Sequence, residues 1–85
     1  MPVVFRRGGL RYYFFSNEGA PREVAHIHVE GGGRDAKVWL DPEVSIAESY
    51  GFTSRELGHI LRVVIDNRDR ILRAWHDHFG DGRPV

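Results

Sequence analysis

The chain has 85 residues, and its 12 basic and 12 acidic residues give a formal net charge of zero, so no overall attraction to nucleic acid or membranes is expected. It contains no cysteine, which excludes disulfides and thiolate zinc sites and is typical of a reducing cytoplasm. The sequence shows no secretory leader and no apolar stretch near the roughly 20 residues that a membrane helix needs. We therefore expect one cytoplasmic domain, residues 1–85, with no cofactor and no membrane partner.

Residues 1–50 are predicted to form strands and turns. Short runs of apolar and aromatic residues in this part are bounded by glycine, proline and asparagine, which favour turns. In chain order, the predicted strands are Val3–Arg6, Leu10–Phe15, Val24–Glu30, Arg34–Leu40 and a short last strand around Val44 and Ile46. The predicted turns and loops between them are Gly8-Gly9, residues 16–22, Gly31–Gly33 and Asp41-Pro42. The pattern predicts a small, mainly antiparallel sheet of four to five strands.

The third predicted strand carries two histidines one residue apart, His26 and His28. Because side chains alternate across a strand, these two imidazoles share one face, whereas Ile27 and Val29 share the other. The apolar pair is expected to enter the core, so the histidines are expected to stand together outside the packed interior. An imidazole ligates metals, transfers protons and binds phosphate, which makes this face a candidate site.

The neighbouring strand is placed by matching apolar residues across the hairpin, because cross-strand partners share a face. The predicted pairs are Ile27 with Val38, Val29 with Ala36, His28 with Lys37 and His26 with Trp39. This register makes residues 31–34 a four-residue loop. A two-residue loop keeps the same faces, whereas a three-residue loop places the histidines beside apolar residues. The favoured register therefore puts both histidines on one polar face with Lys37 and Trp39.

Residues 53–79 are predicted to form one long helix, and residues 80–85 a flexible tail. Thr53-Ser54-Arg55-Glu56 is a capping box, in which the Thr53 hydroxyl accepts from the Glu56 amide and the Glu56 carboxylate reaches back. Apolar residues follow at helical spacing, with Arg68 as the polar exception. The length of this helix leaves two alternatives. Either its end overhangs and contacts a partner or a second copy of the chain, or the helix bends near Asn67.

The predicted sheet and helix together indicate an α+β fold, in which the sheet packs on one long C-terminal helix. The apolar residues on the inner faces of both elements are expected to form the core. They are Ile27, Val29, Val38, Leu40, Leu57, Leu61, Val64, Leu72 and Trp75.

Several motifs together resemble a bacterial family catalogued as domain of unknown function 4160. They are His26-Ile27-His28-Val29-Glu30, the run from Ala36 to Pro42, Gly51-Phe52 with Arg55-Glu56-Leu57, Asn67-Arg68, and Trp75. Two prolines usually precede the first histidine in this family, where the present chain has Val24 and Ala25. Members are often encoded beside another small protein, in pairs that look like toxin–antitoxin modules. The resemblance therefore implies a cognate small protein partner and a role in such a pair, and it carries over no catalytic residue.

Three interpretations of the histidine face stay open. In the first, the histidines are structural or belong to a protein interface, as in a binding module or the antitoxin half of a pair. In the second, the face binds RNA or cleaves it without a metal. In the third, the two histidines bind Zn²⁺ with Glu30 as a third ligand, in a small metal-binding domain.

The RNA interpretation assigns a role to each polar or aromatic group near the histidines. A metal-free nuclease needs an acid, a base and cations for the charge that develops on the phosphate. The candidate catalytic residues are His26, His28 and Lys37, and the candidate RNA-binding residues are Arg11, Tyr13 and Trp39. Arg11 would add a second cation, and Tyr13 or Trp39 would stack on a base. The functional hypothesis is thus an RNA-directed toxin within a toxin–antitoxin-like pair, acting as a metal-independent ribonuclease.

Overall fold

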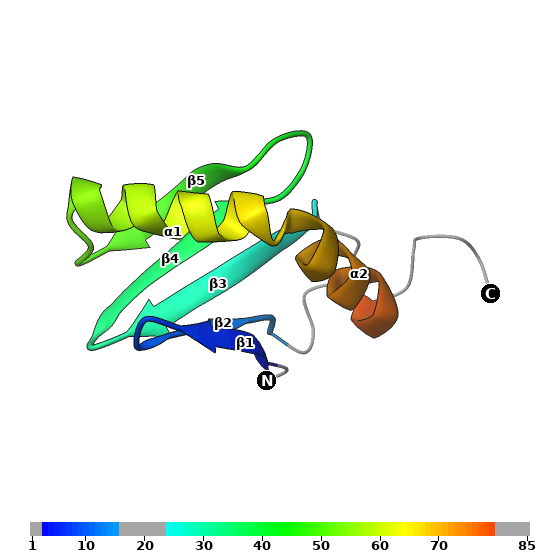
Figure 1. Ribbon diagram of the computed structural model, residues 1–85, viewed down its shortest axis with the longest axis horizontal. Coiled ribbons are helices and arrows are strands. Elements are labelled where there is room, and N and C mark those ends of the chain that lie inside the picture. Colours follow the sequence, from blue (N-terminus) through cyan, green and yellow to red (C-terminus); the bar gives the residue numbers. More distant parts are fainter. Residues whose placement is uncertain (1–2, 16–23, 80–85) are drawn as a thin grey trace.

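The computed structural model of the protein describes residues 3–15 and 24–79, which form an antiparallel sheet and two helices (Figure 1). The elements are β1 (Val3–Arg7), β2 (Leu10–Tyr13), β3 (His26–Gly31), β4 (Arg34–Trp39), β5 (Ser45–Tyr50), α1 (Ser54–Asp66) and α2 (Arg68–Phe79). This arrangement confirms the α+β class. The predicted loop at residues 16–22 and the predicted tail at residues 80–85 lie outside the described residues.

The five strands pair in sequence order, β1-β2-β3-β4-β5, and each is antiparallel to the next. Two-residue glycine turns make the first and third hairpins. Gly8 and Gly9 have φ angles of 59° and 79°, and Gly32 and Gly33 have 61° and 77°. Positive φ at both central residues is the geometry of a tight turn whose twist matches the strands, and it favours glycine. The β3–β4 loop is therefore the two-residue form, and the expected four-residue loop at residues 31–34 is wrong because Gly31 and Arg34 pair with each other.

The predicted register of the β3–β4 hairpin is confirmed at every pair. Ile27 pairs with Val38, Val29 with Ala36, His28 with Lys37 and His26 with Trp39. The apolar pairs are fully or almost fully buried. Matching apolar residues across the hairpin was therefore sufficient to place all the side chains of both strands on the correct faces.

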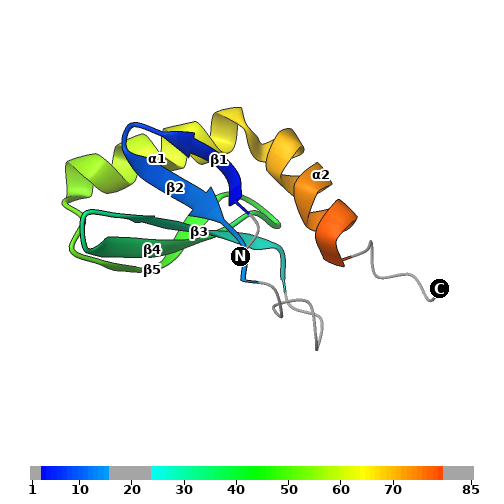
Figure 2. The same cartoon turned by 90° about the horizontal axis from the view of Figure 1, so that it is seen from below.

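Helix α1 covers one face of the sheet (Figures 1 and 2). The predicted core residues Ile27, Val29, Val38, Leu40, Val64 and Trp75 are buried, whereas Leu57, Leu61 and Leu72 are only partly buried and pack against the core. The buried stripe of the helices instead runs through Ile60, Val63, Val64, Ile71 and Trp75. Leu57, Leu61 and Leu72 flank this stripe, because an amphipathic helix has an apolar arc wider than the line that faces the sheet.

Aromatic side chains of β1 and β2 complete the core. Phe5 stacks on Tyr12 with ring centroids 4.6 Å apart, and Phe14 packs edge-on against Trp75 at 5.4 Å. Burial raises the pKa of the Tyr12 hydroxyl above its ordinary value, an effect that the nearby charge of Arg7 opposes. Within the described residues, this buried hydroxyl has no hydrogen-bond partner.

The expectation of one long helix is wrong, because the chain breaks at Asn67 into α1 and α2. Asn67 has φ −113° and ψ 14°, and its side-chain Nδ2 donates to the Val63 carbonyl at 2.8 Å. The next residue, Arg68, donates from Nε to the carbonyl of Leu40, at the end of β4, at 2.8 Å. Arg68, the polar exception in the helical pattern, therefore hydrogen-bonds the start of α2 to the sheet. After this residue α2 turns across the end of the sheet (Figure 1), as the bend alternative predicts.

The capping box at the start of α1 is confirmed and has a third member. Thr53 Oγ1 accepts from the Glu56 amide at 3.1 Å, and Glu56 Oε1 accepts from the Thr53 amide at 2.8 Å. The other Glu56 oxygen forms an ion pair with Arg34, beside the β3–β4 turn. The hydrogen bond from the Thr53 amide, helped by Arg34, lowers the pKa of the Glu56 carboxyl. Neither described helix is long and apolar enough to cross a membrane.

Candidate functional site

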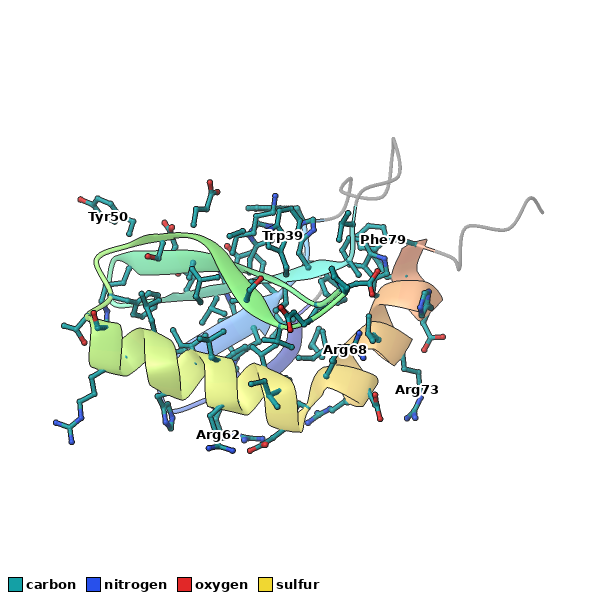
Figure 3. The ribbon with its side chains drawn as sticks, turned by 90° about the horizontal axis from the view of Figure 1, so that it is seen from above. Trp39, Tyr50, Arg62, Arg68, Arg73 and Phe79 are labelled. Carbon is teal, nitrogen blue, oxygen red and sulfur yellow. The ribbon has the colours of Figure 1, made fainter. Side chains whose placement is uncertain are left out.

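The sheet face opposite α1 carries the side chains that the sequence singled out. We define the aromatic–histidine face as Arg11, Tyr13, His26, His28, Lys37 and Trp39. Strand pairing places Tyr13 opposite His28, His28 opposite Lys37, and His26 opposite Trp39, so three adjacent strands contribute to one surface. Figure 3 shows Trp39 on the side of the sheet away from α1. The structure therefore brings all six predicted site residues onto one face.

Ring contacts connect this face from β2 into β3. The Arg11 guanidinium lies 4.6 Å from the centroid of the Tyr13 ring, and Tyr13 stacks on His28 at 5.5 Å with an interplanar angle of 30°. The two histidine rings meet edge to face at 5.1 Å. The imidazoles therefore contact each other, and neither stands alone on the sheet.

The contacts continue from β3 into β4. His26 lies edge-on to Trp39 at 5.7 Å, and Lys37 Nζ lies 4.5 Å from the centroid of the same indole. A cation therefore sits against an aromatic ring at each end of the series, Arg11 on Tyr13 and Lys37 on Trp39. Such contacts are worth about 0.5–1 kcal/mol each at exposed sites, and they hold long basic side chains against the sheet.

His26 does not lie outside the packed interior, so that expectation is corrected. The side chain is fully buried at 0% exposure, and the Trp75 ring of α2 packs on it at 5.1 Å. Its Nδ1 is 2.8 Å from the Val24 carbonyl oxygen, and since a carbonyl only accepts, Nδ1 carries the proton of this bond. The bend at Asn67 is the cause, because it brings α2 over the end of β3. A ring without exposed surface does not contact a bound molecule directly.

His28 is half-buried and keeps an exposed part, in contrast to His26. Phe15 packs on it with centroids 4.4 Å apart and is itself 39% exposed. Phe15 is a member of this surface that sequence reasoning left out of the site. The signal was available, because Phe15 is two residues from Tyr13 and two-residue spacing keeps a side chain on the same face of an extended segment.

The cations of the face differ in how far they are neutralised. Arg11 Nη2 lies 2.7 Å from Glu30 Oε2, and the Arg11 side chain is 25% exposed. Lys37 is half-buried against Trp39, and Glu48 lies opposite it on β5. The accessible part of the face therefore combines aromatic surface with basic groups that have acidic neighbours.

The expected zinc ligands do not form a three-ligand group. Glu30 pairs with Arg11, and the Nδ1 of His26 is bonded to the Val24 carbonyl. Across residues 3–15 and 24–79, no three histidine, aspartate or glutamate side chains are grouped closely enough to hold a metal ion.

Among the hollows formed by described residues, two lie near the ends of the sheet. The first has a volume of about 310 Å³ and is lined by Gly8, Leu10, Arg34, Phe52, Arg55, Glu56 and His59. The second has a volume of about 290 Å³ and is lined by Val24, Trp39, Asp41, Pro42, Glu43 and Ser45. The second hollow shares Trp39 with the aromatic–histidine face, so the two surfaces are contiguous.

Comparison with known proteins identifies a family for this chain. Residues 9–76 match the family model described as Domain of unknown function (DUF4160). No curated protein and no solved structure matches the chain. The matched region includes all of the aromatic–histidine face, both helical caps of α1 and Trp75.

Proposed function

This chain belongs to the family of domain of unknown function 4160, and from that premise we propose that it is the RNA-directed component of a bacterial toxin–antitoxin-like pair. In this proposal the protein acts in the cytoplasm and binds single-stranded RNA on the aromatic–histidine face. The observation that carries the proposal is the gathering of aromatic rings and cations from three adjacent strands on the sheet face opposite α1.

The arrangement suits single-stranded RNA for a physical reason. RNA bases have flat apolar faces that stack on aromatic side chains, while the backbone phosphates need cations close by. Trp39 and Phe15 are the accessible rings, and Lys37 lies directly against Trp39. A base stacked on this surface would have a cation within reach of its phosphate. Stacking is largely independent of base identity, so we expect weak sequence preference.

The two histidines take different roles in this proposal. His28 keeps exposed surface, and we assign it the acid–base role in any cleavage of the RNA. The buried His26 is a positioning residue, because it contacts His28 and Trp39 on one side and Trp75 on the other. Lys37 supplies the positive charge nearest to Trp39.

The binding experiment is a titration of a fluorescent single-stranded RNA 12-mer followed by anisotropy at low salt. We expect Trp39→Ala to weaken binding about tenfold or more, since stacking contributes about 1–3 kcal/mol per base. Lys37→Ala should weaken binding less and reduce its salt dependence. Arg62→Ala removes a matched charge from α1, on the opposite side of the molecule (Figure 3), and should leave the affinity unchanged. If the Arg62 and Lys37 variants lose affinity equally, binding is not located on this face.

The cellular experiment separates an RNA-cleaving toxin from a binding protein. The chain is expressed alone in bacteria while growth and total RNA are followed. Growth arrest with RNA decay that disappears in a folded His28→Ala variant supports the proposal. Harmless expression, or toxicity that survives His28→Ala, argues instead for a non-enzymatic half of the pair.

The second candidate function is that of a protein-binding module, and a specific observation favours it. The hollow beside Trp39 is lined by the carboxylates of Asp41 and Glu43, and its described lining residues include no basic side chain. Acidic groups repel RNA phosphates but attract a basic protein segment. This part of the surface therefore points to a protein partner.

A further inference from the structure

The hollow beside Trp39 combines an apolar floor with an acidic rim. Val24, Trp39 and Pro42 supply the apolar surface, and Val24 is 52% exposed. Asp41 and Glu43 supply the rim. We call this hollow the Trp39 groove. A volume of about 290 Å³ accommodates one or two large side chains and is too small for a folded domain.

The lining residues of the groove that the structure describes offer no basic partner to the rim carboxylates. Asp41 approaches one cation, Arg68 Nη2, at the long distance of 3.8 Å, and the Asp41 side chain is 66% exposed. Glu43 is exposed near the end of the β4–β5 connection. Exposed carboxylates in a concave, partly apolar site attract a cation more strongly than they would on a flat surface.

The groove opens onto an edge of the sheet. Ser45 lines the groove and is also the first residue of β5, which has no strand on its outer side within the described residues. An exposed strand edge offers backbone donors and acceptors to an extended segment. A bulge at Ala47, where the pairing jumps from Lys37–Glu48 to Val38–Ile46, interrupts the edge beyond Ile46. Backbone pairing would therefore be confined to the groove end of β5.

We propose that the Trp39 groove binds a short extended segment of the cognate protein, with an apolar side chain on Trp39 and Pro42 and flanking arginine or lysine residues on Asp41 and Glu43. This inference rests on the two-protein pair of the proposed function, but it does not depend on RNA binding. The occupant is a basic protein segment because the rim repels phosphates. A second copy docked through the same groove would bring its own acidic rim against Asp41 and Glu43, and like charges repel.

A protein segment bound in the groove would compete with RNA for the Trp39 ring. The same indole lines the groove and carries Lys37 on the aromatic–histidine face. A segment seated in the groove would cover ring surface that RNA would use for stacking. Occupancy of the groove by the partner would thereby lower the RNA affinity, and this supplies a physical route to neutralisation within the pair.

The experiment titrates the whole protein with labelled nine-residue peptides. The probes have a central leucine or phenylalanine flanked by arginines, and matched probes have glutamates in place of the arginines. We expect the arginine peptides to bind at least tenfold more tightly than the glutamate peptides and to weaken as salt is raised. Glu43→Lys should reduce the affinity for the arginine peptides about tenfold. Asp77→Lys makes the same charge change at an exposed position of α2 and should have no effect.

A second variant changes the groove at a position outside the Asp41-Pro42 turn, in case Glu43→Lys disturbs that turn. Ser45→Arg places a long cation in the groove from an exposed strand position, and thermal melting checks that both variants are folded. Equal binding of arginine and glutamate peptides overturns the proposal, as does an unchanged affinity in Glu43→Lys and Ser45→Arg. Concentration-dependent dimerisation that Glu43→Lys abolishes would make a second copy the occupant and also overturn it. If the parent protein does not bind RNA in the separate titration, the RNA proposal is refuted, and the peptide result still holds.

Discussion

The two faces of the sheet are built from alternate residues of the same strands, yet they are held in different ways. The face under α1 is mostly apolar, and Ile27, Val29 and Val38 on it are completely buried beside aromatic residues of β1 and β2. The opposite face is held by ring contacts and by cations lying on rings, from Arg11 to Trp39. The first face is held by close packing of apolar side chains, including the Phe5–Tyr12 stack. The second depends on Trp75, which reaches it only because the helix breaks at Asn67.

The contrast also appears between the two histidines. His26 and His28 share a strand and a face, but α2 buries His26 completely and leaves His28 half-buried. Equivalent positions in the alternating pattern therefore have different environments. The two-residue alternation along a strand predicts which face of the sheet a side chain occupies. It does not predict which other segments cover that face.

Replacing Trp75 by alanine should destabilise the protein most, because this side chain contacts residues on both faces of the sheet. The indole is 5% exposed and contacts Phe14, Phe79 and His26. We expect a loss of about 3–5 kcal/mol in the free energy of unfolding, because truncating a buried aromatic leaves a cavity. Chemical and thermal denaturation measure this loss. Arg73→Ala, on the outer side of α2 (Figure 3), should change stability by less than about 0.5 kcal/mol. An unchanged melting curve for Trp75→Ala would place this residue outside the core.

Replacing each histidine in turn by alanine should destabilise the protein to different extents. His26→Ala leaves a cavity beside Trp75 and removes the bond to the Val24 carbonyl, so we expect a loss of about 2–4 kcal/mol. His28→Ala removes a half-buried ring and should reduce stability by about 1 kcal/mol. Urea denaturation of both variants gives the comparison. Equal losses would mean that the two environments are the same in solution.

Replacing Tyr12 by phenylalanine should stabilise the protein. The ring stacks on Phe5 in the core, while the buried hydroxyl finds no partner among the described residues. Removing an unsatisfied buried hydroxyl and keeping the ring should raise the free energy of unfolding by about 1 kcal/mol. Tyr50→Phe is the matched control, because Tyr50 is 70% exposed at the end of β5, and its melting temperature should not change. A destabilised Tyr12→Phe variant would show that the hydroxyl is hydrogen-bonded.

The smallest effect is expected from Glu56 and depends on pH. The carboxyl has a pKa below its ordinary value of 4.5 because it accepts from the Thr53 amide and pairs with Arg34. A group with a lowered folded pKa adds stability above its ordinary pKa, and this stability is lost as the pH falls through the folded value. Stability of the parent protein should therefore decline as the pH falls below about 4.5.

Glu56→Gln should show a shallower decline over this acidic range in melting temperature measured against pH. Glu48→Gln changes an exposed carboxylate outside the cap and should follow the parent protein. A Glu56→Gln profile parallel to that of the parent would mean that the cap does not contribute to the acid dependence.

Much of the local structure was predictable from neighbouring residues. The pairing of Ile27 with Val38 and of Val29 with Ala36 followed from apolar alternation, and the capping box followed from Thr53 and Glu56. The shared face of the histidines, Lys37 and Trp39 followed from the same register. These features depend on contacts within one hairpin or one helical turn, and such contacts have a fixed geometry once the residues are known.

The environment of the candidate site depended on residues far apart in the chain. Arg68 bonds to the Leu40 carbonyl, and Trp75 packs on His26. Helical periodicity alone left open whether the helix overhangs or bends, because local hydrogen bonds are similar in both cases. Only the fit of α2 against the end of the sheet selects the bend. Residue type and alternation therefore decided which side chains share a face, whereas packing between distant segments decided that His26 is enclosed and that Trp39 remains accessible.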